Sequence, residues 1–418
     1  MAMTKTTDIT NSIHARYEKQ YMLEAAKRPG LWAQFIDWQD PIPETAGNGS
    51  SFNYTFYGES DFTDTALTED ADVTPNAISD GTMALTPAEY GYSWARSKLA
   101  NYQSMQPIEK VMADIATRHR VGSIDRILRK GACGFGATKP TMTYLKYNAA
   151  TMATLDPDSA NYLVDYAYLT DLATAAAASG IEAFEDVGFV SLIHPILANE
   201  IKGLTEWKSM GYYQDKGMLF SGPQKPFTLA GITFIPTPEA RLHLGAGAAA
   251  TIFSKSTNMT ADTLQSALAK KATQIVLANA TNCAVGQYLT IGTKETESVS
   301  PGANLEQVRV TGIASTPTID IMAMGVGQDF GLRFDHASGE AVSCTGNVAS
   351  IPILGKDSIL GIHGADTGRY GKPIVKEGLD LLNRFKYFGW YWYGGVATVQ
   401  KRVILGRVGV TGGLMGYN

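Results

Sequence analysis

The feature of this sequence that most restricts its fold is a long acidic stretch without one basic residue. Between Arg28 and Arg96 the chain has no lysine or arginine, but it has eleven acidic residues. The next stretch, from Arg96 to Lys139, carries nine basic residues against three acids, a net charge of +6. Because opposite charges favour contact, we expect the acidic stretch to lie on a basic surface; the alternative is a solvated acidic loop.

The acidic stretch has the pattern of a two-stranded arm. "SFNYTFYG" (51–58) alternates aromatic and polar residues with the period of a strand, and "TMALTPAEYGYSWA" (82–95) supplies the returning strand. A lone hairpin is marginally stable in water, so the arm should rest on another surface. The acidic residues that we expect to contact a neighbouring subunit are Asp61, Asp64, Glu69, Asp70 and Asp72.

A long amphipathic helix should follow the arm. Apolar residues recur at helical spacing between Pro107, which suits a helix start, and Gly131, which we expect just past the helix end. Its polar face is basic and could meet phosphates, the acidic arm of another copy, or water. The candidate inter-subunit or DNA-facing residues are Lys110, Arg118, Arg120, Arg126, Arg129 and Lys130.

The remaining segments alternate helices and strands. We expect an amphipathic helix over Ser12–Lys27, an alanine-rich helix ending at Gly180, and strands within 225–244. In "GFVSLIHPILANEI" (188–201) a strand ends on His194 and a helix carrying Glu200 follows. A catalytic histidine needs a nucleophile or metal within reach. No residue pattern indicates such a nucleophile or metal near His194. We therefore expect its ring to form a hydrogen bond with the backbone beside Pro195.

Residues 248–349 have a different residue pattern from the segments on both sides: short β-type runs are separated by Gly, Asn and Pro. This pattern predicts an inserted all-β module. We expect a short helix around Asp262–Lys270 inside it, a flexible joint at "GAGAAA" (245–250) before it, and a structural role for the Asp335–His336 pair. Seven of the nine residues 385–393 are aromatic and should form core or a subunit interface.

Known catalytic and cofactor-binding motifs are incomplete or absent in this sequence. "GACGFGATKP" (131–140) lacks the lysine of a phosphate-binding loop, and "GAGAAA" lacks the βαβ context of a dinucleotide site. No HExxH or GxSxG motif is present, and the three cysteines are far apart, as expected for reduced structural thiols. We therefore predict no enzyme activity, no catalytic residue, no cofactor and no metal. No apolar window approaches the length of a membrane span, and the start lacks a signal-peptide pattern, which favours cytosol-like conditions.

The order of these parts resembles the major capsid proteins of tailed bacteriophages with the Hong-Kong-97-type fold. "FVSLIHPILANEIKG" (189–203), "GITFIPTPEA" (231–240) and "ILGKDSILGI" (353–362) are similar to segments of the N-four-like major capsid family, with Ser358 at a position where an alanine-like residue is expected. The resemblance covers most of the chain outside 248–349.

The resemblance implies an α+β fold divided into six parts. These are an N-terminal arm with its helix (1–45), an extended loop (46–95), a peripheral domain with a long spine helix (96–164), a first axial part (165–247), the inserted β-rich domain (248–349) and a second axial and peripheral part (350–418). In this fold the extended loop lies across an adjacent subunit.

The function that the resemblance implies is self-assembly, through pentamers and hexamers, into an icosahedral virion shell around double-stranded DNA contacted without sequence specificity. Expected partners are further copies, a portal, and scaffolding or decoration proteins, with no membrane involved. The subunit would be made in the bacterial cytoplasm. Two other classes stay open: the shell protein of a cellular nanocompartment, and a surface-layer or adhesin protein.

Overall fold

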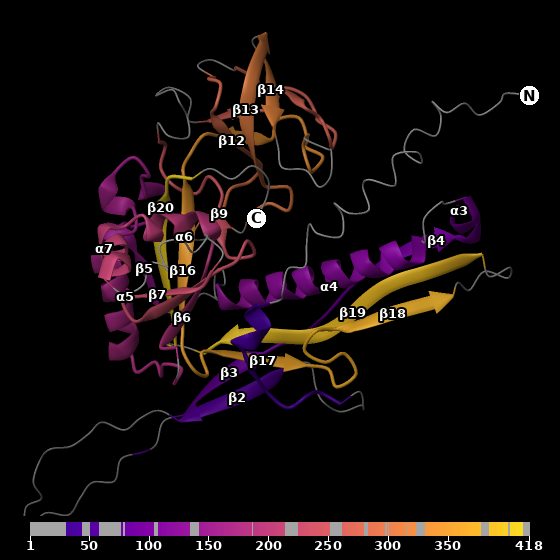
Figure 1. The fold of residues 1–418 in the computed structure, drawn as a ribbon. Coiled ribbons are helices and arrows are strands. Elements are labelled where there is room, and N and C mark those ends of the chain that lie inside the picture. Colours follow the sequence, from indigo (N-terminus) through magenta and orange to yellow (C-terminus); the bar gives the residue numbers. More distant parts are fainter. Residues whose placement is uncertain are drawn as a thin grey trace, which may run out of the picture.

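The computed structural model describes residues 31–43, 51–57, 77, 80–103, 108–133, 142–185, 187–213, 225–250, 261–279, 283–296, 299, 301–315, 317–322, 331–377, 384–399 and 402–412. These residues form a mixed α+β fold with many strands and few helices (Figure 1). The predicted N-terminal helix lies outside them. So do the five acids expected at the tip of the acidic arm.

One sheet is built around the long aromatic strand β19 (Phe385–Thr398). On one side β19 pairs antiparallel with β4 (Ala88–Ser97), and on the other with β18 (Lys372–Glu377) and β17 (Ile359–His363), while β1 (Asp37–Trp38) extends β17. The helix α4 (Ile108–Ala132) lies along this sheet (Figure 1). It confirms the predicted long helix, although it continues one residue past Gly131.

The C-terminal half of α4 lies between two sheets. Its buried Ile124 and Leu128 pack with Trp390 and Trp392 of β19 and also with Leu405 of the second sheet. A Cβ at Gly131 would overlap the Cγ2 of Val396. Gly131 therefore serves close packing of the helix on β19 rather than the helix end.

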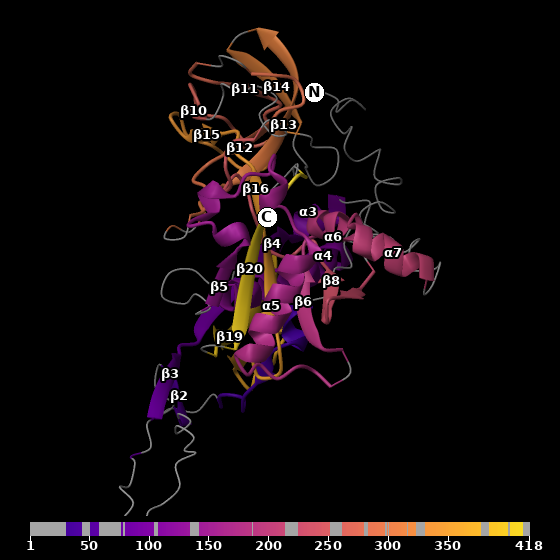
Figure 2. The same cartoon turned by 90° about the vertical axis from the view of Figure 1, so that its left-hand side faces the viewer.

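The second sheet has seven strands in the order β5-β20-β16-β6-β8-β7, with β9 paired to β16. Their bounds are β5 Met142–Leu145, β6 Phe189–Ile193, β7 Phe227–Leu229, β8 Ile232–Pro236, β9 Leu242–His243, β16 Asn347–Leu354 and β20 Val403–Val410. Every residue of β16 and β20 is buried, as expected for central strands covered on both faces. The helices that pack on this sheet are α5 (Tyr166–Ala178), α6 (Pro195–Lys202) and α7 (Thr205–Tyr213) (Figure 2).

A six-stranded antiparallel unit projects from one end of the second sheet (Figure 1). Its order is β10-β15-β12-β13-β14-β11, with bounds β10 Ala261–Thr263, β11 Gln274–Val276, β12 Tyr288–Ile291, β13 Glu306–Ser315, β14 Thr318–Met322 and β15 Ala341–Ser343. The two outer strands meet through the Leu264–Leu277 bridge, so the sheet closes on itself as a small barrel. Its interior is a separate apolar core that includes Leu277, Ile291 and Val308.

A two-stranded hairpin extends from the opposite end of the molecule (Figure 1). It pairs β2 (Phe52–Tyr57) antiparallel with β3 (Asp80–Leu85), with Phe52 opposite Leu85. At its base Phe52 and Leu85 pack with Ile362 of the first sheet. The returning strand is split: β3 stays in the hairpin, whereas β4 leaves it to join β19.

Three local predictions are wrong. No helix forms over Asp262–Lys270, because Leu264 and Leu268, spaced as on a helix face, instead form strand bridges with Leu277 and His336. Residues 245–250 are not a loose joint, because Gly247 N–H donates to Gly346 O at 2.8 Å and most of the segment is buried. The predicted boundary at 349 falls inside β16.

Candidate interaction surfaces

His194 and Glu200 hold secondary structure together. His194 is the N-cap of α6, where its Nδ1 accepts the Ile196 N–H at 3.3 Å, which confirms that the ring bonds backbone beside Pro195. Burial, aided by the Arg129 charge and opposed by Glu239, lowers the pKa of His194 to about 4, so the ring stays neutral and can accept. Glu200 accepts the backbone N–H and hydroxyl of Thr411, both at 2.6 Å.

Two of the predicted basic candidates on α4 contact another segment of the same subunit, although the Arg126 side chain is 37% exposed. Arg129 is 4% exposed and donates to the backbone carbonyl of Glu239 at 2.8 Å. Arg126 forms an ion pair with the Glu239 carboxylate at 2.9 Å. Both arginines therefore fasten the helix to the segment between β8 and β9 of the same subunit.

The other basic candidates form a narrower surface. Lys130 is exposed, Arg118 is half-buried, and Arg120 donates to the carbonyl of Gly371 at 3.3 Å, next to β18. The backbone of Lys110 belongs to α4, but its side chain lies outside the described part of the chain. The basic face available to a partner is thus smaller than the sequence suggests.

The aromatic residues of β19 divide between its two faces. Phe388, Trp390 and Trp392 are buried on the side of α4. Phe385 and Tyr387, on the alternate positions, are 38% and 41% exposed. The strand therefore supplies core on one face and leaves an aromatic outer face open to solvent.

A buried polar junction joins the barrel to the seven-stranded sheet. Glu295 of the barrel lies 2.7 Å from Nδ1 of His243 on β9 and 2.5 Å from Nη2 of Arg241. Although burial raises it, His243 and Arg241 hold the pKa of Glu295 below its ordinary range. Burial, opposed by Glu295, lowers the pKa of His243 to about 4, and its Nε2 contacts the Ser350 hydroxyl at 2.6 Å.

A second set of buried contacts strengthens the same junction. Gln307 of β13 and Asn347 of β16 exchange side-chain amide hydrogen bonds of 2.9 and 3.1 Å. Asn347 also accepts the N–H of Gly245 at 2.9 Å, and Gln307 donates to Thr290 at 3.0 Å. Since every one of these polar groups is buried, the junction holds the barrel in a defined position.

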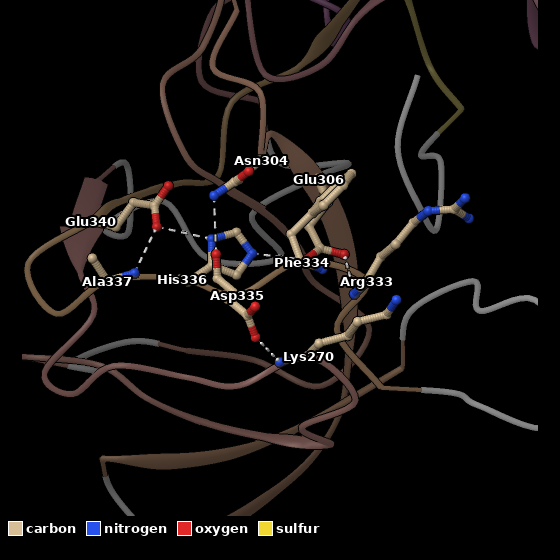
Figure 3. Close-up of polar contacts among 9 residues, drawn as sticks. All are labelled: Lys270, Asn304, Glu306, Arg333, Phe334, Asp335, His336, Ala337 and Glu340. Carbon is tan, nitrogen blue, oxygen red and sulfur yellow. Dashed lines mark hydrogen bonds and ion pairs between the residues drawn. The ribbon is translucent and has the colours of Figure 1, made fainter. Parts of the chain in front are cut away.

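A further cluster lies within the barrel, around His336 (Figure 3). Its Nε2 is 2.7 Å from Oε1 of Glu306, and its Nδ1 is 2.9 Å from Oε2 of Glu340. The neighbouring Asp335 instead accepts the backbone N–H of Lys270 at 2.7 Å. The Asp335–His336 pair is thus structural, but the two side chains have different partners.

Sequence reasoning missed the partners of the buried histidines. His336 and Glu340 are four residues apart, a spacing visible in the sequence. The Glu306–His336 and Glu295–His243 contacts join residues 30 and more positions apart and depend on barrel closure. No local pattern could reveal them.

The described residues offer no metal centre, because none of their groups of three or more His, Cys, Asp or Glu side chains could hold an ion. The cysteines Cys133, Cys283 and Cys344 are all free thiols. None of the helices in the described ranges is both long and apolar enough to cross a lipid bilayer.

Comparison with known proteins finds similar solved structures. No family model matches the sequence, and no curated protein matches it. The chain is similar to the capsid of Ralstonia phage GP4, with 8% identity and a TM-score of 0.45 over 92% of this chain and 89% of that one. It is similar to the capsid of cyanophage Pam1, with 13% identity and a TM-score of 0.47 over 93% and 94% of the two chains. A third similar structure is the acidic stable capsid of Helicobacter pylori bacteriophage KHP30, at 11% identity and a TM-score of 0.45, covering 91% of this chain and 89% of that chain.

Proposed function

We propose that this chain is the major capsid protein of a tailed double-stranded DNA bacteriophage, with the Hong-Kong-97-type fold. The observation that carries the proposal is the arrangement of its parts. A protruding hairpin is followed by a 25-residue helix lying along a long-stranded sheet, and then by a helix-covered second sheet. This is the chain order that the sequence resemblance implies.

The subunit has surfaces suited to repeated self-association. The hairpin extends beyond the body of the subunit, and the outer face of the first sheet carries the exposed Phe385 and Tyr387. We assign the acidic tip of the hairpin to a neighbouring subunit, with Arg118, Arg120 and Lys130 as basic contacts. Each contact can be weak, because closed symmetry and multivalency add many of them together.

Assembly into pentamers and hexamers, and then into an icosahedral shell, is the expected consequence. The internal contacts of four polar side chains support a structural role: Arg126, Arg129, His194 and Glu200 each hold one element of the subunit to another. A portal and scaffolding or decoration proteins would complete the particle, and DNA would be contacted through its phosphates without sequence readout.

Electron microscopy of the purified full-length protein tests the proposal directly. We expect closed, roughly spherical shells with pentameric and hexameric units. Flat lattices would instead support the surface-layer alternative, and monomers that never assemble under any salt condition would contradict shell formation. Genes for a portal and a terminase beside the coding gene would separate a phage capsid from a nanocompartment shell, which would have a cargo gene there.

A further inference from the structure

The His336 cluster of the barrel contains a proton whose position follows from geometry. Glu306 accepts the backbone N–H of Phe334 at 3.3 Å and that of Arg333 at 3.1 Å, and Glu340 accepts that of Ala337 at 3.2 Å. Backbone N–H groups only donate, so both carboxylates act as acceptors here. Each carboxylate also faces a different nitrogen of the His336 ring (Figure 3).

A histidine ring can donate from both nitrogens only as the imidazolium cation. The side chains of His336 and Glu306 are 0% exposed, so water cannot replace a lost contact without a rearrangement. A neutral ring would direct a nitrogen lone pair at one of the two carboxylates in this buried site, which is unfavourable at low local dielectric. The native contacts therefore require the protonated ring.

The other charged groups around the ring are engaged elsewhere. Asp335 accepts the Lys270 backbone N–H, and the side chains of Lys270 and Arg333 point their cationic ends away from His336 (Figure 3). Burial lowers the pKa of His336, but its hydrogen bonds and charge interactions with Glu306 and Glu340 outweigh burial and raise that pKa above 6.5.

The ring fastens residues 331–340 to β13 through Glu306, and its contact with Glu340 lies within the segment itself. Residues 331–340 pair with 264–272 through reciprocal backbone hydrogen bonds of 2.9 Å between His336 and Leu268, and through Leu332 N–H to Ala272 O at 2.8 Å. Glu306 belongs to β13, and Glu340 directly precedes β15. Loss of the ring contact with Glu306 would weaken the attachment of the segment to β13.

We propose that His336, Glu306 and Glu340 form a proton-dependent clamp that holds residues 331–340 against the barrel and releases them as the solution becomes alkaline. A histidine whose folded-state pKa is raised stabilises the structure fully below its ordinary value. It loses that contribution as the pH rises through the raised value. The clamp is therefore closed below pH 6.5 and opens as the pH rises through the raised pKa of His336.

Amide hydrogen exchange of the full-length chain, read by mass spectrometry between pH 6 and pH 9, tests the clamp. After division by the intrinsic rates at each pH, peptides covering 264–272 and 331–340 should lose protection as the pH rises. Exchange at the ring C2 position of His336 should titrate with a midpoint above 6.5. Peptides from β16 and β20 should keep their protection and serve as the internal reference.

Two variants connect the effect to the cluster. His336→Gln should abolish the pH step in 331–340, and Glu340→Gln, at a side chain that is 22% exposed, should keep the fold and move the midpoint to lower pH. His363→Gln, outside the barrel, should leave the step unchanged.

The clamp is overturned if the wild-type segment keeps equal protection at both pH values, if its step persists in His336→Gln, or if the C2 midpoint lies at or below 6.5. The C2 titration needs no variant, so a variant that fails to fold leaves the test decisive. All measurements use unassembled chain, so the result is independent of whether the protein forms shells.

Discussion

Three buried histidines in this chain have pKa values shifted in different directions because their partners differ. His194 accepts a backbone N–H, and His243 contacts a hydroxyl and a single carboxylate, Glu295, that also pairs with Arg241; burial lowers the pKa of both histidines to about 4. His336 faces two carboxylates, and its pKa is raised despite burial. The pH dependence of stability should therefore have opposite signs in the seven-stranded sheet and in the barrel.

At His194 the expected effect is acid sensitivity without catalysis. Its folded-state pKa of about 4 lies below the ordinary 6.5, so stability is present above pH 6.5 and is lost as the pH falls toward 4, by up to about 3 kcal/mol. His194→Asn keeps a good N-cap residue and should still assemble, with a smaller loss of stability between pH 7 and pH 4 in urea unfolding. His194→Ala should cost about 1 kcal/mol at pH 7, because it removes the acceptor. An equal acid loss in wild type and His194→Asn, or a hydrolase activity that His194→Asn abolishes, would contradict this role.

Two glycines of α4 should respond oppositely to the same substitution. A Cβ at Gly122 meets no atom within 4 Å, so Gly122→Ala should stabilise the protein by about 0.5–1 kcal/mol through better helix propensity. Gly131→Ala would push against Val396 and should destabilise it by about 1–3 kcal/mol. Urea unfolding followed by the fluorescence of the nearby Trp390 and Trp392 measures both. A stabilised Gly131→Ala variant would refute the close packing of α4 on β19.

At the scale of elements, helices and strands could be predicted where the sequence has strong periodicity. The aromatic alternation of β2, the apolar repeat of α4 and the glycine after α5 all predicted what forms, because local preference and burial agree there. At 262–270 they disagree: the helical spacing of Leu264 and Leu268 is overridden by strand bridges to residues far along the chain. Arg126 and Arg129 looked like surface charges because their partner, Glu239, lies 110 or more positions away.

The hairpin tip offers the most direct test of inter-subunit contact. Changing Asp61, Asp64, Glu69, Asp70 and Asp72 to lysine should leave the subunit soluble and folded, since the hairpin base packs through Phe52 and Leu85. Assembly should fail, because lysines would face a basic surface. Wild-type assembly should weaken with salt, as the screening length falls from about 8 Å at 0.15 M to about 3 Å at 1 M. Light scattering and electron microscopy report both effects, and normal shells from the variant would end the electrostatic docking hypothesis.

At the scale of the whole molecule, the barrel is a separate core with a buried polar base. Its apolar interior is distinct from that of the seven-stranded sheet, yet Glu295 and Gln307 hold it to that sheet. In the sequence, the change of residue pattern at 248–349 predicts such a module. The junction could not be predicted from the sequence. Its residues, such as Gln307 and Asn347, resemble ordinary strand or turn residues, and only the fold brings them into contact.

Removing the barrel should cost less than breaking its junction. Replacing 261–343 by a short Gly/Ser linker takes Glu295 and Gln307 away together, and water can then solvate Arg241 and Asn347, so the remaining subunit should stay folded. Glu295→Gln leaves the barrel in place and Arg241 without its buried counter-charge, at a cost of about 3 kcal/mol or more. Thermal unfolding of the two variants compares these costs directly. An unfolded deletion variant would show that the barrel is part of the fold's main core.

Closure of the barrel also affects whether neighbouring subunits in the proposed shell could pair strands with one another. Subunits of a shell stand side by side at the spacing of a two-dimensional crystal, so any unpaired strand on a projecting part would meet the same strand of its neighbours again and again. Such edges template cross-subunit sheets and aggregation. The Leu264–Leu277 bridge joins the outer strands to each other, so in the described part of the barrel these two strands are paired internally. In the proposed shell, contacts between neighbouring barrels would then fall to side chains rather than to these strands, and the barrel surfaces could diversify without joining sheets of different subunits.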